Sequence, residues 1–368
     1  MKRYDVAIIG AGMAGASLAA EIAGEATVLL LEAEERPGYH STGRSAAFWS
    51  ETYGGPLIQP LTRASYDPLA KGGFLKPRGA LHIADAGGEA ALDALQRDFE
   101  GTEVELERLG RAALERRIPG LKKEWTGALW EPSCADIDVA GLHADFLKRA
   151  RRSGAELATD ARLEAAERGG AGWRLETRQG GFEAAILIDA AGAWADPVAS
   201  LAGIAPIGIQ PYRRTMVQLR VDPEALADLP LVVDALGRFY FKPEAGGRLW
   251  LSPHDETPCA ACDCSPEEED VALAIDRLER VAGWRIERVE HKWAGLRSFA
   301  RDRLPVYGFA DGRRDFFWCA GQGGFGIQTA PAAARLAADL LLGRDTWLDP
   351  TPYLASRFGP RPAVRTTG

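Results

Sequence analysis

One sequence feature constrains the fold of this chain more than any other: the run Gly10-Ala11-Gly12-Met13-Ala14-Gly15 between a predicted strand and a predicted helix. Residues 4–9 are a short apolar run that suits a strand buried on both faces. Residues 12–23 are rich in alanine and precede Gly24, which is typical of a helix and its end. Gly10 would permit a tight turn, Gly12 would leave room for a pyrophosphate, and Gly15 would let helix and strand pack closely. The pattern predicts a dinucleotide site at the helix N-terminus.

A second buried strand follows at residues 27–31, and Glu32 stands at its end. A carboxylate at this position can accept hydrogen bonds from ribose hydroxyls. Strand, helix and strand in this order open a parallel sheet, so the predicted class is α/β with a Rossmann-like domain. Residues 185–189 and 316–319 predict further buried strands, and residues 142–152 and 331–342 predict helices.

Two stretches of different character interrupt this pattern. Residues 77–132 mix short segments with many charges, and residues 214–250 alternate in the manner of antiparallel strands. The length of 368 residues suits two or three domains, at about 150 residues each. The expected fold is therefore α+β overall, with an antiparallel sheet from these stretches inserted into the parallel unit. The tail, residues 357–368, is expected to be poorly ordered.

Composition excludes several classes of protein. The net charge of -8 argues against a nucleic-acid protein, which would normally carry a basic face. No apolar run approaches the roughly 18 residues that span a bilayer, and the N-terminus leaves no room for a secretory signal. Five cysteines in a large chain do not suggest a disulfide framework. We therefore expect a cytoplasmic protein without a transmembrane segment or a nucleic-acid partner.

Two features favour FAD over NAD as the dinucleotide. The loop at residues 37–47 is long and rich in small residues, where an NAD-binding domain would continue directly to its next helix. A late glycine-rich segment, residues 321–326, would bring backbone N–H groups and a helix N-terminus to a second point on the ligand. That positive end could stabilise negative charge on a flavin ring.

Motifs along the whole chain resemble the D-amino-acid-oxidase-like FAD-dependent oxidoreductases, and within them the D-arginine dehydrogenase-like subgroup. They are GAGMAGAS (10–17), PGYHSTGRSAA (37–47), AAGAWA (190–195), QPYRR (210–214), FYFKP (239–243), HKWAGLRSF (291–299) and GQGGFGIQT (321–329). The resemblance implies an FAD-binding domain made of residues 1–75, 138–208 and 291–368. It implies a substrate-binding domain made of residues 76–137 and 209–290.

Together, the glycine pattern and the resemblance predict which residues hold FAD. They are Gly10, Gly12, Met13, Ala14, Gly15, Glu32, Ala33, Ser41, Thr42, Gly43, Arg44, Ser45, Ala46, Ala191, Gly192, Trp194, Gly321, Gly323, Gly324, Phe325, Gly326 and Ile327. Ser45 and Ala46 would approach the flavin ring, and Gly324 and Ile327 its far side.

The resemblance assigns the substrate to Tyr53, Arg214, Tyr240, Arg297 and the backbone around Gly324. Two guanidinium groups suit a carboxylate, because each can grip both oxygens through paired N–H donors. Residue chemistry alone leaves other interpretations open. Arg214 beside Arg213 could be one of a solvated pair, and the tyrosines could be ordinary core aromatics. An arginine inside the apolar segment around Arg297 needs a partner in any case.

Two positions depart from the subgroup. Phe48 stands where its members carry a histidine, and Ala80 stands where they carry a glutamate that pairs with a cationic side chain. Because the counter-charge is missing, we expect a D-2-amino acid with a neutral or apolar side chain as substrate. The expected reaction is hydride transfer from Cα to flavin N5, followed by hydrolysis to the 2-oxo acid. A secondary amine such as sarcosine, a 2-hydroxy acid, or a flavin scaffold without a small substrate are the alternatives, and the electron acceptor (O2, a quinone or another) is left open.

Other reactive residues give weaker signals. Cys259, Cys262 and Cys264, with His254 nearby, do not have zinc-finger spacing, so a surface loop is favoured over a metal site. Cys319 is expected in the core rather than at a flavin attachment point. The remaining histidines lack a serine and aspartate pattern that would suggest hydrolysis; they are His40, His82, His143 and His291.

Overall fold

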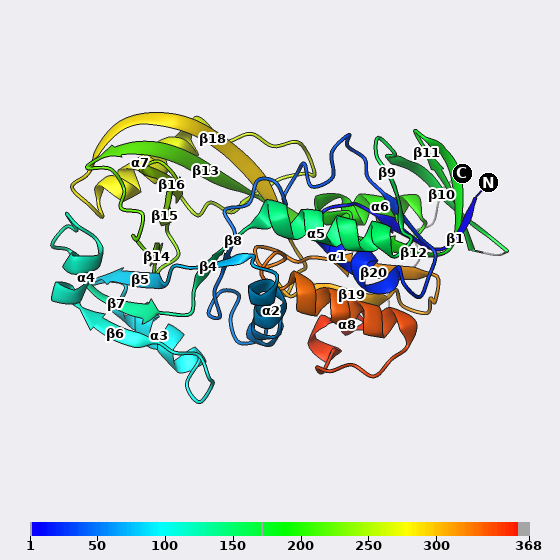
Figure 1. Cartoon of the computed structure of the whole chain (residues 1–368), viewed down its shortest axis with the longest axis horizontal. Coiled ribbons are helices and arrows are strands. Elements are labelled where there is room, and N and C mark those ends of the chain that lie inside the picture. Colours follow the sequence, from blue (N-terminus) through cyan, green and yellow to red (C-terminus); the bar gives the residue numbers. More distant parts are fainter. Residues whose placement is uncertain (1, 171, 360–368) are drawn as a thin grey trace.

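A computed structural model describes residues 2–170 and 172–359 of the chain. Two large sheets share the molecule, with the parallel unit at one end and the antiparallel unit at the other (Figure 1). In the described ranges, no helix is long and apolar enough to cross a bilayer.

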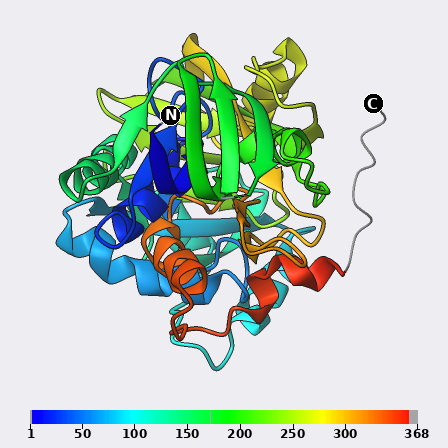
Figure 2. The same cartoon turned by 90° about the vertical axis from the view of Figure 1, so that its right-hand side faces the viewer.

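The first sheet contains the predicted dinucleotide unit. Its parallel core is β9-β2-β1-β12-β20, and antiparallel strands flank it. The strands are β1 (Arg3–Ile9), β2 (Val28–Leu31), β9 (Glu156–Ala158), β10 (Leu163–Gly169), β11 (Gly172–Thr177), β12 (Gly180–Asp189), β19 (Val306–Phe309) and β20 (Phe316–Ala320). The strands β10–β12 lie nearest the viewer in Figure 2. Every residue of β2 and β20 is buried, as their continuous apolar sequences predict.

Helices cover both faces of this sheet. One face packs against α1 (Met13–Ile22), α5 (Val139–Arg152) and α8 (Ala330–Leu342), and the other against the short α6 (Ala195–Leu201). The side chain of Asp138 accepts a hydrogen bond from the Gly141 N–H and so caps α5, which begins three residues before the predicted start at 142. The predicted helix at 331–342 begins one residue earlier, at Ala330.

The second sheet is antiparallel except for one parallel pair, β14 with β5. Its order is β17-β13-β16-β15-β14-β5-β7-β6, and β18 pairs with β13. The strands are β5 (Ala80–Asp85), β6 (Glu107–Gly110), β7 (Trp125–Glu131), β13 (Gln210–Asp222), β14 (Leu231–Asp234), β15 (Tyr240–Glu244), β16 (Arg248–Ser252), β17 (Thr257–Pro258) and β18 (Arg285–Phe299). Helices α3 (Glu89–Asp98), α4 (Arg111–Arg117) and α7 (Glu268–Glu279) pack on it.

A small three-stranded sheet and one helix lie between the two large units. The sheet is formed by β3 (Phe48–Trp49), β8 (Ala135–Ile137) and β4 (Leu75–Pro77), and the helix is α2 (Gln59–Lys71). Short 3-10 helices are η1 (Gly192–Trp194), η2 (Thr351–Tyr353) and η3 (Ala355–Phe358).

Two boundaries differ from the sequence expectation. The boundary expected at residue 291 falls inside β18, because residues 291–299 continue the ladder with β13 in the second sheet. The tail expected to be poorly ordered from residue 357 is ordered at Arg357, whose guanidinium donates hydrogen bonds to Asp302 and to the carbonyl of Leu304. Residues 360–368 lie outside the described residues.

Candidate functional site

A cavity of about 400 Å³ runs from Glu32, at the end of β2, to Arg214 and Arg297 on the antiparallel sheet. Most of the predicted FAD residues line it: Gly10, Gly12, Met13, Ala14, Glu32, Ala33, Ser41, Thr42, Arg44, Ser45, Ala46, Ala191, Gly192, Trp194, Gly323, Gly324, Gly326 and Ile327. The lining does not include Gly15, Gly43, Gly321 or Phe325. The glycine turn, the loop at residues 37–47 and the late glycine-rich segment therefore meet at one cavity.

The glycine turn has no room for side chains. Gly10 has a φ of +99°, and a Cβ built on it would lie 2.5 Å from the carbonyl oxygen of Ala190. A Cβ on Gly15 would lie 1.9 Å from the carbonyl oxygen of Gly10, so the expected close packing of helix and strand is confirmed. A Cβ on Gly12 would lie 3.3 Å from Thr42 Oγ1, at the cavity wall.

Glu32 is buried at the far end of the cavity. Its carboxylate accepts hydrogen bonds from the Ala11 N–H (3.0 Å) and the Glu34 N–H (3.1 Å). Burial raises its pKa, because the charged form loses hydration. Each oxygen retains a lone pair, so hydroxyl donors such as those of a ribose suit this position.

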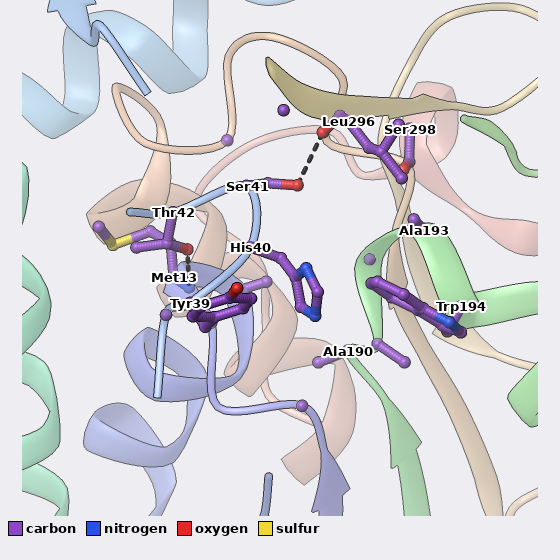
Figure 3. Close-up of a pocket in the computed structure, with 18 of the residues that line it drawn as sticks. Met13, Tyr39, His40, Ser41, Thr42, Ala190, Ala193, Trp194, Leu296 and Ser298 are labelled. Carbon is purple, nitrogen blue, oxygen red and sulfur yellow. Dashed lines mark hydrogen bonds between the residues drawn. The ribbon is translucent and has the colours of Figure 1, made fainter. Parts of the chain in front are cut away.

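The loop at residues 37–47 connects the two sheets across the cavity. Thr42 Oγ1 accepts a hydrogen bond from the Met13 N–H (3.0 Å), and Ser41 Oγ donates one to the Leu296 carbonyl (2.7 Å), as Figure 3 shows. The Arg44 guanidinium donates to the carbonyls of Ala294 and Cys264 and pairs with Asp263. The role expected of Arg44 in holding the cofactor stays a prediction, since these contacts tie the loop to the antiparallel sheet.

Three rings from distant segments gather in the cavity (Figure 3). The His40 ring lies 4.5 Å from Trp194 and 5.0 Å from Tyr39, centroid to centroid. Trp194 was expected here, whereas sequence reasoning gave no role to Tyr39 or His40. Their position depends on the fold of the loop, and no local sequence pattern reports it.

The residues that line the cavity suit the parts of FAD. The glycine turn and the N-terminus of α1 suit a pyrophosphate, Glu32 suits a ribose, and residues 323–327 would lie beside the flavin.

The opposite end of the cavity holds Arg297. Its Nη1 donates to Tyr53 Oη at 2.8 Å, and its Nη2 lies 3.5 Å from Tyr240 Oη. A Cβ on Gly324 would lie 1.9 Å from Tyr53 Oη and 3.1 Å from Arg297 Nη1. The structure therefore brings together all four of these predicted substrate residues, although Tyr53 does not line the cavity itself.

Strand register explains why Arg214 joins them. Tyr212 lies opposite Arg297 and Arg214 lies opposite Gly295, so both arginines occupy one face as diagonal neighbours. Arg213 points to the other face and pairs with Glu267 and Asp270. The solvated interpretation is therefore wrong for Arg214, which is only 4% exposed, and the Arg213 side chain is itself only 15% exposed.

Arg214 is incompletely paired for a buried cation. Its Nε donates to the Asp255 carbonyl (2.7 Å) and its Nη2 to Glu256 (3.1 Å), while its buried Nη1 has no hydrogen-bond partner. Burial and the positive charge of Arg297 lower the pKa of Arg214 to about 10, so it remains charged at neutral pH.

His254 stands behind Tyr240, with ring centroids 5.6 Å apart. Its Nδ1 donates to the Gly237 carbonyl (2.6 Å). Burial, Arg214 and Arg297 lower its pKa to about 3, so the ring is neutral near pH 7. In the described part of the chain, no group of three or more His, Cys, Asp or Glu residues is arranged for a metal ion. Cys264 instead accepts a hydrogen bond from Arg44 through its carbonyl.

Cys319 and the remaining histidines are buried or contact neighbouring protein groups. Cys319 is buried in β20, as expected. His143 Nε2 donates to the Ala11 carbonyl (2.8 Å), His82 bonds to buried Glu131, and the His291 ring stacks on Trp293.

Residues 5–340 match a model of the DAO family, described as FAD dependent oxidoreductase. The chain belongs to this family, and is an enzyme that takes FAD as its cofactor. It is 27% identical over 379 residues to a glycine oxidase from Geobacillus kaustophilus (strain HTA426), with 96% of this chain and 97% of the relative covered.

Solved structures agree with the fold. A crystal structure of glycine oxidase from Geobacillus kaustophilus is similar with a TM-score of 0.86 at 25% identity, covering 97% of this chain and 99% of that one. An L-proline dehydrogenase from P. horikoshii has the same TM-score at 22% identity, covering 97% and 98%. The predicted Rossmann-like α/β class is confirmed.

Proposed function

We propose that this enzyme oxidises a small D-2-amino acid with a neutral side chain, or glycine, to the imino acid, which water then hydrolyses to the 2-oxo acid and ammonia. The observation that carries the proposal is the pair of guanidinium groups at one end of the cavity, Arg214 buried and Arg297 partly buried. Arg297 donates hydrogen bonds to the hydroxyls of Tyr53 and Tyr240, and Arg214 keeps a buried donor without a partner. Buried positive charge of this kind is stabilised by a carboxylate. The glycine oxidase relatives support an amino-acid substrate.

The cavity also favours a neutral side chain. Among the described residues that line it, the carboxylates are Glu32 and Glu34, both at the end opposite Arg297. Ala80 is fully buried in a cluster with Ala46, Met216 and Tyr240. Phe48 packs against Tyr53 and Tyr240, with centroid distances of 5.4 and 6.2 Å. A cationic side chain would find no counter-charge at this end.

The chain's own residues then orient the substrate. Arg214 and Arg297 hold the carboxylate, Tyr53 and Tyr240 fix Arg297, and the substrate Cα faces residues 323–327. Bound FAD supplies the acceptor for the hydride that leaves Cα. Holding Cα–H in line accelerates this step by orientation, and no side-chain base is required if the amine binds in its neutral form.

The test is anaerobic bleaching of the FAD-loaded protein by a panel of D-amino acids, glycine, L-enantiomers, sarcosine and 2-hydroxy acids. We expect bleaching by glycine and neutral D-amino acids, and a loss of at least about 100-fold in kcat/KM for Arg297→Lys, which cannot form the paired bonds. Best turnover with D-Arg or D-Lys would refute the neutral side chain. A flavin that stays oxidised with every amino acid would refute the proposal.

Further points accompany this proposal. Arg214, Tyr240 and Arg297 support membership of the D-arginine dehydrogenase-like subgroup, with Phe48 and Ala80 altering its side-chain preference. A secondary amine is the second candidate, because a carboxylate held by two arginines leaves the amine substituent unspecified. We also propose a cytoplasmic location and the division into FAD-binding and substrate-binding domains, with residues 291–299 placed in the second.

A further inference from the structure

Tyr53 reaches Arg297 from a segment without regular structure. Residues 50–53, the Tyr53 segment, follow β3 and form neither helix nor strand. The buried N–H and C=O groups of such a segment need hydrogen-bond partners that no helix or strand ladder supplies. The segment is nonetheless buried, since Ser50, Glu51 and Thr52 are each less than a tenth exposed.

A buried carboxylate collects most of these bonds. Glu131, at the end of β7, is fully buried and accepts from the Glu51 N–H (2.7 Å), Thr52 Oγ1 (2.7 Å) and Ser50 Oγ (3.0 Å). His82 Nε2 lies 3.3 Å from the same carboxylate. Burial acts to raise the pKa of Glu131, but the hydrogen bonds from His82, Thr52 and Ser50 outweigh it and the pKa is lowered. The group is therefore an ion at neutral pH.

Gln328 holds the segment from the other side. Its Oε1 accepts from the Ser50 N–H (3.2 Å), and its Nε2 donates to the Tyr53 carbonyl (3.1 Å) and to Thr62 Oγ1 (2.9 Å). Gln328 lies just before α8, while Glu131 belongs to the antiparallel sheet. The Tyr53 segment is thus fixed to both units of the fold.

The consequence of these bonds is the place of one hydroxyl. The Tyr53 ring packs against Phe48 and Phe325, with centroids 5.4 and 5.6 Å away, and its Oη accepts the Arg297 bond at 2.8 Å. A shift of the segment would move this hydroxyl and release one nitrogen of Arg297. Glu131 does not line the cavity, so it can act on a substrate only through this connection.

We propose that Glu131 is a positioning residue for carboxylate binding: its charge fixes residues 50–53, and Tyr53 Oη in turn fixes the orientation of Arg297. This inference rests on the proposed function, in which Arg297 binds the substrate carboxylate. Glu131 also lies opposite Ala80 in the β5–β7 ladder, but its oxygens are occupied by four donors and do not provide the missing counter-charge for a basic substrate.

The test is a double-mutant cycle between Glu131→Gln and Tyr53→Phe in the FAD-loaded full chain. Isothermal titration calorimetry measures the Kd of benzoate, a carboxylate with no Cα–H to oxidise, and steady-state kinetics separate KM from kcat. We expect Glu131→Gln to raise the benzoate Kd and KM about tenfold, with a smaller change in kcat, and to have less than about a twofold effect when Tyr53→Phe is already present. An equal factor in both backgrounds, or no change in Kd, would overturn the proposal.

Two further variants keep the result interpretable. Asp339→Asn removes another buried carboxylate, on α8, and should leave the benzoate Kd unchanged. Should Glu131→Gln fail to fold, Thr52→Val removes the hydroxyl that donates to the Glu131 carboxylate. Its effect on the benzoate Kd must also disappear in the Tyr53→Phe background. Arg297→Lys tests the proposed function separately: if it leaves benzoate binding intact, the carboxylate site itself is wrong, whatever Glu131 does.

Discussion

The contact between Gly324 and Tyr53 gives the sharpest test of the carboxylate site. A Cβ on residue 324 would lie 1.9 Å from Tyr53 Oη, whereas an ordinary contact needs at least 3.4 Å. Gly324→Ala therefore displaces the hydroxyl by about 1.5 Å, against the packing of its ring on Phe48 and Phe325. That displacement breaks the 2.8 Å hydrogen bond from Arg297.

The expected loss follows from the bond that is broken. A hydrogen bond to a charged group contributes about 1.5–3 kcal/mol, so kcat/KM should fall roughly 10- to 150-fold. Tyr53→Phe loses the same bond, but it also removes the clashing oxygen. Adding Gly324→Ala to Tyr53→Phe should then cost less than about threefold more.

Steady-state kinetics on the best amino-acid substrate measure this, with flavin content determined from the visible spectrum of each variant. Equal flavin content is needed, since residue 324 is also predicted to lie beside the flavin. An unchanged kcat/KM in Gly324→Ala, or full multiplication of the two effects in the double variant, would refute the reasoning.

Three other substitutions test the cofactor end and the electrostatics of the site. Gly15→Ala should lower the free energy of unfolding by about 3 kcal/mol or more, measured by thermal unfolding of the apoprotein, because its Cβ meets the Gly10 carbonyl at 1.9 Å. Glu32→Gln should weaken FAD binding about tenfold in a fluorescence titration. Burial raises the pKa of Glu32, so its ionisation lowers the stability of the folded state as the pH rises. The apo Glu32→Gln variant should therefore be no less stable than the wild type at pH 7, and a clear decrease in its free energy of unfolding would contradict this. His254→Asn should leave the acidic limb of the kcat/KM profile unchanged, because the pKa of His254 is about 3. Unfolding measurements should also show that this variant loses less stability than the wild type as the pH falls from about 6.5 towards 3. The reason is that the unfolded wild-type chain protonates its histidine at a higher pH than the folded one does.

Local patterns were sufficient for the nucleotide half of the fold. The run from β1 to β2 is short in sequence, and Gly10 and Gly15 leave room for backbone atoms that the βαβ geometry brings close. Arg213 and Arg214 mark the limit of this reasoning. The sequence could not say which of the two side chains faces the cavity, because the alternation along a strand separates two faces without identifying either one.

The sequence could not predict residues whose role depends on contacts between distant segments. Glu131 carries no motif, and its importance arises only when the Tyr53 segment folds against the end of β7. His40 likewise meets Trp194 only because a loop crosses between the two sheets. The boundary expected at residue 291 falls inside β18, because the strand continues through residues 291–299.

The ladder between β13 and β18 bears on how such a chain can change its substrate. Both arginines stand on this one ladder, so a slip of one residue would turn Arg297 away from the cavity, and Arg214 would lose its diagonal neighbour. Positions 48 and 80 belong to other strands, β3 and β5, and can vary without touching that register. Under the proposed function, substitutions at positions 48 and 80 would therefore change the side-chain preference one at a time, while the two arginines would be kept together by the ladder that carries them.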